Sequence, residues 1–233
     1  MIKQQVKNFL GKKILVITAH PDDESYCAAG TAIENHRLNG QTILICATLG
    51  EKGKSHLKKL VSDSELKRIR RQELNRACKL AHIAKLFVLN LPDGNVKNFV
   101  DKFRSQAMKI AKRYKPEVVL GFGRDGISGH YDHVAAGRVA KHLARELGVP
   151  FFRFTVSPVL HGKATTWFMQ RRKHGRYKRD VTFIHPTIKI KIDPKKKKQV
   201  LRSHASQMDG KNLSTGFPAY AVKELLRAEY FVG

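Results

Sequence analysis

The sequence predicts an α/β fold, with a mostly parallel sheet of about five to six strands and helices on both faces. Through residue 156, short apolar runs rich in β-branched residues alternate with longer amphipathic segments, which is typical of strand–helix–strand units. Clusters of histidine and aspartate follow two of the apolar runs. Ligands of open α/β sheets bind at the carboxyl ends of the strands, so these clusters are the candidate site.

The first cluster is His20-Pro21-Asp22-Asp23-Glu24, directly after the apolar run at residues 14–17. His20 and Asp23 are three positions apart, so one tight turn can direct both side chains at a single ion. Imidazole nitrogen and carboxylate oxygen are common ligands of catalytic zinc. Asp22 then points elsewhere and is free to take a proton. The alternative is an ordinary turn whose aspartate caps the next helix, although a cap needs only one carboxylate.

The second cluster is Ser128-Gly129-His130-Tyr131-Asp132-His133, after a predicted strand at 118–121 and a glycine-rich loop. His130 and His133 have the spacing that places two side chains on one side of a helical turn. Alternatively, they are surface histidines at the start of a helix over 134–147, with Asp132 favouring its N-terminus. Two such clusters, each after a strand, together predict a metal site.

The His-Pro-Asp-Asp-Glu motif at 20–24 and the Gly-His-x-Asp-His motif at 129–133 resemble the PIG-L/LmbE-like family of zinc-dependent N-deacetylases. Such enzymes act on N-acetylglucosamine-type groups in glycolipids, thiol precursors, chito-oligosaccharides and antibiotics. The resemblance covers most of the chain and implies one Rossmann-like domain over residues 1–233. It also implies a Zn²⁺ cofactor, although the same ligand types can hold Fe²⁺ or another divalent ion.

The resemblance also implies a role for each residue of the two motifs. His20, Asp23 and His133 would hold the metal, and Asp22 would be the general base that takes a proton from water. His130 would lie near the reacting oxygen, where it stabilises the oxyanion or protonates the amine. Asp132 would set the orientation and protonation of His130.

Three further segments resemble parts of the family that contact substrate. Arg70, in Arg-x-x-Glu, would reach the sugar or its attached group, unless it is an exposed arginine or the neighbouring Arg71 takes that role. Asp93, in a Pro-Asp-Gly turn, would accept hydrogen bonds from sugar hydroxyls or serve only as a turn residue. His204, in Lys-x-x-Leu-x-x-His-x-Ser-Gln, would bind the acyl group or the oxyanion, or else pack against the sheet.

Periodicity and turn signals place the remaining elements. Strands are expected at residues 14–17, 42–48, 86–91, 118–121, 151–156 and 187–192, and helices at 25–38, 62–80, 96–114, 134–147 and after Asp193. The run Lys195–Lys198 is expected to be exposed. Residues 157–190 are interpreted as a basic insertion or hairpin, and residues 194–233 as a C-terminal helical segment that packs back on the domain.

The chain is strongly basic, with 45 Lys and Arg against 19 Asp and Glu and a net charge of +26. Such a charge attracts nucleic acid, anionic lipid head groups and acidic glycans. The cations are dispersed and no RNA-binding aromatic signature is present, which disfavours nucleic acid as the partner. The charge instead suggests an anionic or lipid-linked substrate, or peripheral contact with an anionic membrane. Trp167 and the basic run at 170–179 form the candidate contact, unless they are a solvated loop.

No apolar run is long enough to span a bilayer, and the N-terminal residues lack the apolar segment of a secretory signal. The three cysteines lack paired spacing, so reduced thiols and a cytoplasmic location are expected. A homo-oligomer is compatible with this composition.

The leading hypothesis is therefore a cytoplasmic, metal-dependent amidohydrolase that removes the acetyl group from a small N-acetylglucosamine-type conjugate. One alternative is an N-deacylase of a non-sugar metabolite or an antibiotic. Another is a basic anion-binding protein with a vestigial metal site.

Overall fold

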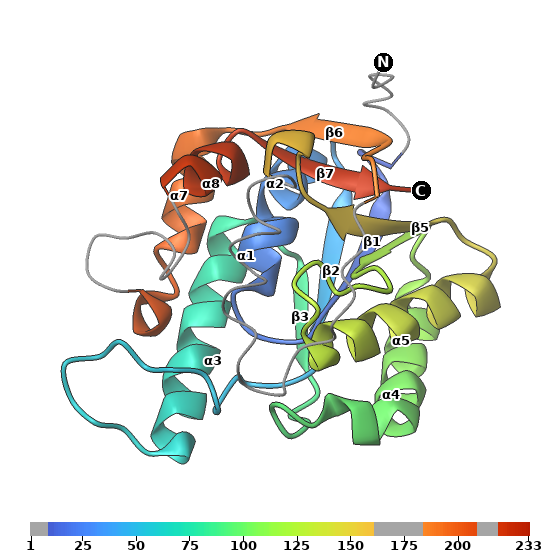
Figure 1. The fold of residues 1–233 in the computed structure, drawn as a ribbon. Helices are drawn as coiled ribbons and strands as arrows, with labels where there is room; N and C mark the ends of the chain where they lie inside the picture. The colour runs from blue at the N-terminus through green and yellow to red at the C-terminus, as the bar shows by residue number, and fades with distance from the viewer. Residues whose placement is uncertain (1–8, 161–183, 209–218) are drawn as a thin grey trace.

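The computed structural model describes residues 9–160, 184–208 and 219–233, and its α/β architecture matches the prediction (Figure 1). The strands are β1 (Lys13–Thr18), β2 (Gln41–Cys46), β3 (Lys85–Val88), β4 (Val118–Gly121), β5 (Phe151–Thr155), β6 (Ile188–Lys191) and β7 (Ala228–Val232). The helices are α1 (Asp23–Cys27), α2 (Ala29–Arg37), α3 (Asp63–Leu80), α4 (Val100–Tyr114), α5 (Tyr131–Leu147), α7 (Pro194–Leu201) and α8 (Ala219–Leu225), with 3₁₀-helices η1 (Val96–Phe99) and η2 (Ala205–Gln207).

Strand order reverses between β1 and β4. The sheet runs β3-β2-β1-β4-β5-β7-β6, and Val16 of β1 lies between Leu44 of β2 and Leu120 of β4. All strands from β3 to β5 in this order are parallel to their neighbours. The turns that follow β1 and β4 therefore leave the sheet side by side, and they carry the two histidine–aspartate clusters.

Helices cover both faces of the sheet (Figure 1). On one side lie α1, α2, α3 and α7, and on the other side lie α4 and α5. The apolar residues of β1, β2 and β4 are fully buried between these layers. Burial on both faces explains why these strands appear in the sequence as continuous apolar runs instead of alternating ones.

The sheet has seven strands, slightly more than predicted. The extra strand is β7, which lies in a segment predicted as helical and inserts between β5 and β6, antiparallel to both. Tyr230, Phe231 and Val232 are aromatic or β-branched residues that favour a strand, and all three are buried. Helices α7 and α8 do form in the described part of this segment, whereas residues 228–232 form a strand.

The predicted helix over 25–38 is divided at Ala28 into α1 and α2. The first turn of α2 is held by the carboxylate of Glu229 on β7, which accepts hydrogen bonds from the backbone N–H groups of Gly30 (2.9 Å) and Thr31 (2.7 Å). An acidic group at this position satisfies N–H groups that have no partner within the helix.

The run Lys195–Lys198 is not uniformly exposed as predicted. The helical period places Lys197 on the buried face of α7 with Val200 and Leu201, and its side chain is 0% exposed. Its ammonium group forms an ion pair with Glu229 and donates to the carbonyl oxygen of Tyr26 (2.8 Å). Asp193 caps α7 as predicted, since its carboxylate accepts from the N–H groups of residues 195 and 196.

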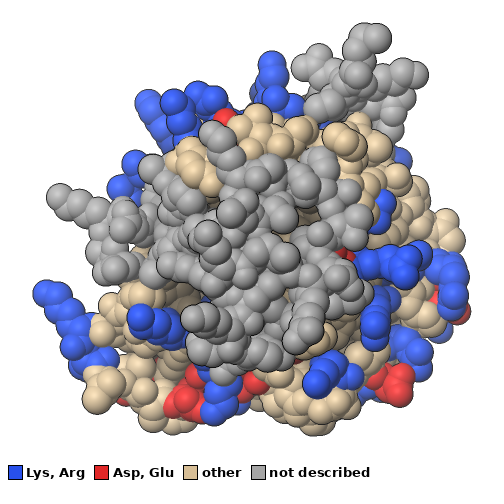
Figure 2. Space-filling model, in the orientation of Figure 1, with Lys and Arg blue, Asp and Glu red and all other residues tan. Residues whose placement is uncertain are grey.

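Lys and Arg side chains are spread around the face shown in Figure 2. Among the described residues, no helix is both long and apolar enough to cross a membrane. The predicted contact at Trp167 and residues 170–179 lies outside the described residues. All three cysteines are free thiols, with Cys46 and Cys78 buried and Cys27 half-buried.

Candidate metal centre

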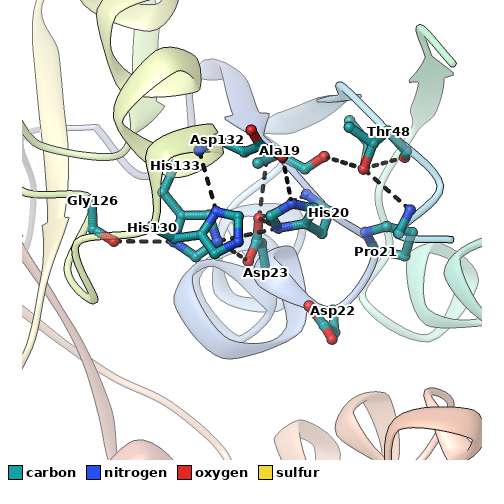
Figure 3. Close-up of polar contacts among 12 residues, drawn as sticks. Ala19, His20, Pro21, Asp22, Asp23, Thr48, Gly126, His130, Asp132 and His133 are labelled. Atoms are coloured by element: carbon teal, nitrogen blue, oxygen red, sulfur yellow. Dashed lines mark hydrogen bonds and ion pairs between the residues drawn. The ribbon is translucent and has the colours of Figure 1, made fainter. Parts of the chain in front are cut away.

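A tight turn after β1 directs the side chains of the first cluster. The Oδ2 atom of Asp23 accepts hydrogen bonds from the backbone N–H groups of Ala19 (3.0 Å) and His20 (2.8 Å), so the carboxylate folds back over the turn. Asp22 adopts the left-handed region, with φ of 100°. Its carboxylate lies apart from the histidine rings in Figure 3, whereas that of Asp23 lies among them.

The second cluster is held by the close contact of α5 with the end of β4. A Cβ atom at Gly137 would collide with the carbonyl oxygen of Phe122, so only glycine permits this approach. The helix begins three residues earlier than predicted, with His130 at its N-cap position and His133 in its first turn. The ring of Phe122 stacks on that of His133, with centroids 4.1 Å apart, and fixes its plane.

The predicted ligands His20, Asp23 and His133 lie together (Figure 3). The Nδ1 atom of His20 is 3.2 Å from Nε2 of His133, and the same Nε2 atom is 3.2 Å from Oδ1 of Asp23. Two nitrogen ligands of a tetrahedral zinc ion, each about 2.1 Å from the metal, lie roughly 3.4 Å apart. The observed spacing of the two nitrogens is therefore close to that of a metal site.

Hydrogen bonds on the far side of each ring assign its tautomer. His133 Nδ1 lies 3.0 Å from the carbonyl oxygen of Gly126, which can only accept, so Nδ1 carries the proton and Nε2 has a lone pair. His20 Nε2 faces carboxylate oxygens of Asp93 (3.1 Å) and Asp132 (3.3 Å), which leaves the lone pair of a neutral ring on Nδ1. Two lone pairs and the Asp23 carboxylate thus converge, an arrangement that needs a cation or a proton between them. The donor set fits a divalent metal ion.

The carboxylates of Asp93 and Asp132 both face Nε2 of His20. Asp132 is fully buried, and its carboxylate accepts from the backbone N–H groups of Gly94 (2.7 Å) and Val96 (3.0 Å) as well as facing His20. The expected link between Asp132 and His130 runs through the backbone N–H of Asp132, which donates to His130 Nδ1 (3.2 Å), while the Asp132 carboxylate also faces His20. Asp93 faces His20 from beside it and accepts from the N–H group of Lys52 (2.8 Å).

Two other groups of three residues around His20 could also hold a metal ion. Ligand atoms of His20, His130 and His133 lie within 4.8 Å of one another, as do those of His20, Asp93 and Asp132. In the second group Asp132 already accepts two backbone hydrogen bonds, which suits a carboxylate that supports a ligand.

The ring of His130 lies close to the imidazole rings of His20 and His133. Its ring centroid is 4.9 Å from that of His20 and 5.0 Å from that of His133, and its Nδ1 atom accepts from the backbone N–H of Asp132 (3.2 Å). Burial, followed by the charges of His20 and His133, lowers the pKa of His130 to about 3. The ring is therefore neutral, with its proton on Nε2, and it can donate a hydrogen bond from that atom.

Arg70 is buried against the first turn, whereas Arg71 is exposed. Its guanidinium donates to the carbonyl oxygens of Gly50 (2.8 Å) and Pro21, and forms an ion pair with Asp22 (3.0 Å). Burial raises the pKa of Asp22 to about 6; Asp23 and Glu24 act in the same direction, and Arg70 opposes them. Asp22 is thus a carboxylate whose proton affinity suits a general base near neutral pH.

His204 lies in a buried polar cluster beside the first turn. Its Nε2 atom is 2.8 Å from the Glu24 carboxylate and 3.0 Å from the Ser25 hydroxyl. Burial alone would lower the pKa of His204, but the charge and hydrogen bond of Glu24 raise it. The predicted alternatives for His204 did not include this contact. Glu24 is fully buried, and its only signal in the sequence is its place in the motif.

Helix α3 connects the first turn to the segment that carries His204. One helical turn after Arg70, Glu73 accepts hydrogen bonds from both the N–H and the hydroxyl of Ser206, each at 2.7 Å. The Arg-x-x-Glu spacing therefore places the guanidinium of Arg70 against the first cluster and the carboxylate of Glu73 against η2. The spacing within α3 does not indicate this partner of Glu73.

The chain has known relatives. It is 36% identical over 126 residues to a probable N-acetyl-alpha-D-glucosaminyl L-malate deacetylase 2 of Bacillus subtilis, covering 53% of this chain and 57% of the relative. It is 26% identical over 164 residues to a 1D-myo-inositol 2-acetamido-2-deoxy-alpha-D-glucopyranoside deacetylase of Saccharopolyspora erythraea, covering 58% and 54%. In both cases the chain spans just over half the length of the curated relative.

Solved structures share the fold. An N,N'-diacetylchitobiose deacetylase from Pyrococcus horikoshii superposes with a TM-score of 0.64 at 22% identity, covering 95% of this chain and 83% of that one. GalB, a 4-carboxy-2-hydroxymuconate hydratase of Pseudomonas putida, superposes with a TM-score of 0.64 at 16% identity, covering 94% and 95%. One architecture therefore carries different reactions, and the fold alone does not define the reaction of this chain.

The family model described as PIG-L, GlcNAc-PI de-N-acetylase, matches residues 15–144. This range runs from β1 to the end part of α5 and includes both histidine–aspartate clusters. It covers more than half of the chain, and the chain therefore belongs to the PIG-L family of de-N-acetylases.

Proposed function

We propose that this chain is a metal-dependent N-deacetylase that hydrolyses the acetamide of an N-acetylglucosamine-type conjugate. The observation that carries the proposal is the convergence of His20 Nδ1, His133 Nε2 and the Asp23 carboxylate on one point, next to a turn that presents Asp22. Family membership and the names of the relatives support an acetylated amino sugar as the substrate.

His20, Asp23 and His133 would hold the ion, with Zn²⁺ as the first candidate and Fe²⁺ as the second. When bound, such an ion acidifies water and polarises an amide carbonyl. The carboxylates of Asp93 and Asp132 hold His20 in the tautomer and orientation that binding requires.

Side chains around the ion would carry out the proton transfers and stabilise the intermediate. Asp22 takes a proton from the water that attacks the acetamide carbon, and Arg70 keeps its carboxylate in place. The neutral ring of His130 donates a hydrogen bond from Nε2 to the oxygen that becomes negative in the tetrahedral intermediate. The C–N bond then breaks, the proton gained by Asp22 passes to the departing nitrogen, and the products are acetate and a free amine.

A deacetylation screen tests the proposal. Purified protein loaded with Zn²⁺ or Fe²⁺ is incubated with N-acetylglucosamine conjugates that carry neutral, acidic and lipid-linked aglycones, and free amine is detected. We expect turnover of at least one conjugate, and Asp22→Asn should keep the metal and lose turnover. Absence of bound metal and of activity after metal addition would overturn the proposal, and full activity of Asp22→Asn would remove Asp22 from the mechanism.

A further inference from the structure

A hollow beside the metal centre has the chemistry of an anion-binding site. It has a volume of about 330 Å³ and is lined by Lys97, Tyr131, Val134, Ala135 and Arg138. Val134 and Ala135 are buried and form an apolar floor, whereas the two cations and the tyrosine ring are exposed at its rim. Ligand sites in proteins commonly combine an apolar lining with a few polar groups in this way.

Residues on both sides of the hollow are adjacent in sequence to residues of the metal centre. On α5, Tyr131 stands between His130 and Asp132. On η1, Lys97 follows Val96, whose N–H group donates to the Asp132 carboxylate. The hollow therefore flanks the first turn of α5, which also carries Asp132 and His133 of the metal centre.

The two cations of the hollow are available to a ligand. Among residues 9–160, 184–208 and 219–233, neither Lys97 nor Arg138 forms an ion pair, although several other exposed cations do, such as Arg104 with Asp101. The ammonium of Lys97 instead lies 5.4 Å from the centroid of the Tyr131 ring. This contact holds the cation over the ring face, and both residues line the hollow.

An anionic substrate would need such cations because the metal centre itself is acidic. Four carboxylates, those of Asp22, Asp23, Asp93 and Asp132, lie around it. Arg70 and a divalent ion would offset three of these charges, so the centre offers no net positive charge to an approaching carboxylate or phosphate. A neutral conjugate needs no such compensation. An acidic centre with an adjoining basic hollow therefore favours an anionic conjugate over a neutral one.

The geometry points to this hollow as the subsite for the aglycone, and to an aglycone that carries a carboxylate or phosphate group. This inference rests on the proposed function. Lys97 and Arg138 would pair with the anion, and Tyr131 would pack against the part of the aglycone next to the sugar. The chain would accordingly prefer acidic conjugates, such as one with malate, over conjugates with a neutral polyol.

The test compares wild type with Lys97→Gln/Arg138→Gln. The substrates are N-acetylglucosamine conjugates of malate, of glycerol phosphate and of myo-inositol. We expect wild type to prefer an acidic conjugate, and the double variant to lose about tenfold in kcat/KM for it while the neutral conjugate changes less than about twofold. The malate and phosphate arms show which anion the hollow takes. The control Lys109→Gln/Lys112→Gln removes the same charge from exposed positions on α4 and should leave all values unchanged.

A second measurement separates this inference from the proposed function. Binding of the same conjugates is measured by calorimetry with Asp22→Asn protein, with and without the changes at Lys97 and Arg138. If wild type deacetylates none of the conjugates, the proposed function fails, yet binding still reports on the hollow. Equal loss of affinity for acidic and neutral conjugates, or loss in the α4 control as well, would overturn the inference.

Discussion

The guanidinium of Arg70 and the carboxylate of Asp22 form an ion pair at 3.0 Å, while the same guanidinium donates to the carbonyl oxygen of Pro21, in the turn after β1, and to that of Gly50, in the loop after β2. Asp22 occupies the left-handed region, which costs free energy for a residue other than glycine. Arg70 offsets this cost and fixes the direction of the proposed base. In this position Arg70 orients Asp22, whereas the resemblance to the family implies contact with the sugar.

The first prediction separates these two roles. Arg70→Lys should lower kcat by about 10- to 100-fold, because one ammonium cannot make both sets of hydrogen bonds and charged hydrogen bonds are worth roughly 1.5–3 kcal/mol. KM and metal content should stay near the wild-type values. Steady-state kinetics and metal analysis provide the measurement, with Arg71→Lys, which changes an exposed neighbour, as the control. A large rise in KM with unchanged kcat would show that Arg70 contacts the substrate.

The second prediction concerns protons released when metal binds. Burial alone would lower the pKa of His20, but in the metal-free chain the hydrogen bonds to Asp132 and Asp93 and the charge of Asp23 raise it to about 10. The ring is therefore protonated at neutral pH and must lose that proton to bind an ion. Affinity should rise with pH by about tenfold per unit up to the pKa, because each metal ion displaces about one proton.

Titration calorimetry of Zn²⁺ into metal-free protein at pH 7.5, in buffers of different ionisation enthalpy, counts these protons. Asp93→Asn removes one of the carboxylates that raise the pKa of His20, so in a series of titrations between pH 7 and 9 its proton release should decline at a lower pH than that of the wild type. A binding enthalpy independent of the buffer would show that His20 is already neutral in the metal-free protein.

The sequence was sufficient for the main elements and for the meeting of the two clusters. Strands β1 and β4 are continuous apolar runs followed by turns, and a parallel sheet brings their ends to one edge. The convergence of His20, Asp23 and His133 follows from this topology together with local spacing. Local pattern could not predict β7, because whether its short apolar run pairs with β5 depends on contacts across the whole sheet.

The residues that support the site were harder to predict for a related reason. The contact of the Asp132 carboxylate with His20 depends on side-chain rotamers and on a backbone N–H group that η1 contributes. The contact between Glu73 and Ser206 joins residues far apart in the chain. Spacing within one helix identifies residues that share a face, but not the partner that the face meets.

The third prediction tests the connection between α3 and the segment that carries His204. Glu73→Ala leaves the buried N–H and hydroxyl of Ser206 without their acceptors, so the free energy of unfolding should fall by about 1–3 kcal/mol. Glu73→Gln is the matched control, because its amide can still accept one hydrogen bond and donate another, and most of the stability should remain. Denaturant unfolding measures both variants. Equal stability of Glu73→Ala and wild type would mean that water replaces the carboxylate.

The fourth prediction concerns the buried ion pair between Lys197 and Glu229, which joins α7 to β7 and the start of α2. Lys197→Met removes one charge and leaves the buried carboxylate of Glu229 without its cation, so the free energy of unfolding should fall by about 3–5 kcal/mol. Lys196→Met changes the exposed neighbour and should alter it by less than about 0.5 kcal/mol. Chemical denaturation of both variants gives the comparison. Similar values for the two variants would mean that Glu229 is neutralised or solvated when Lys197 is absent.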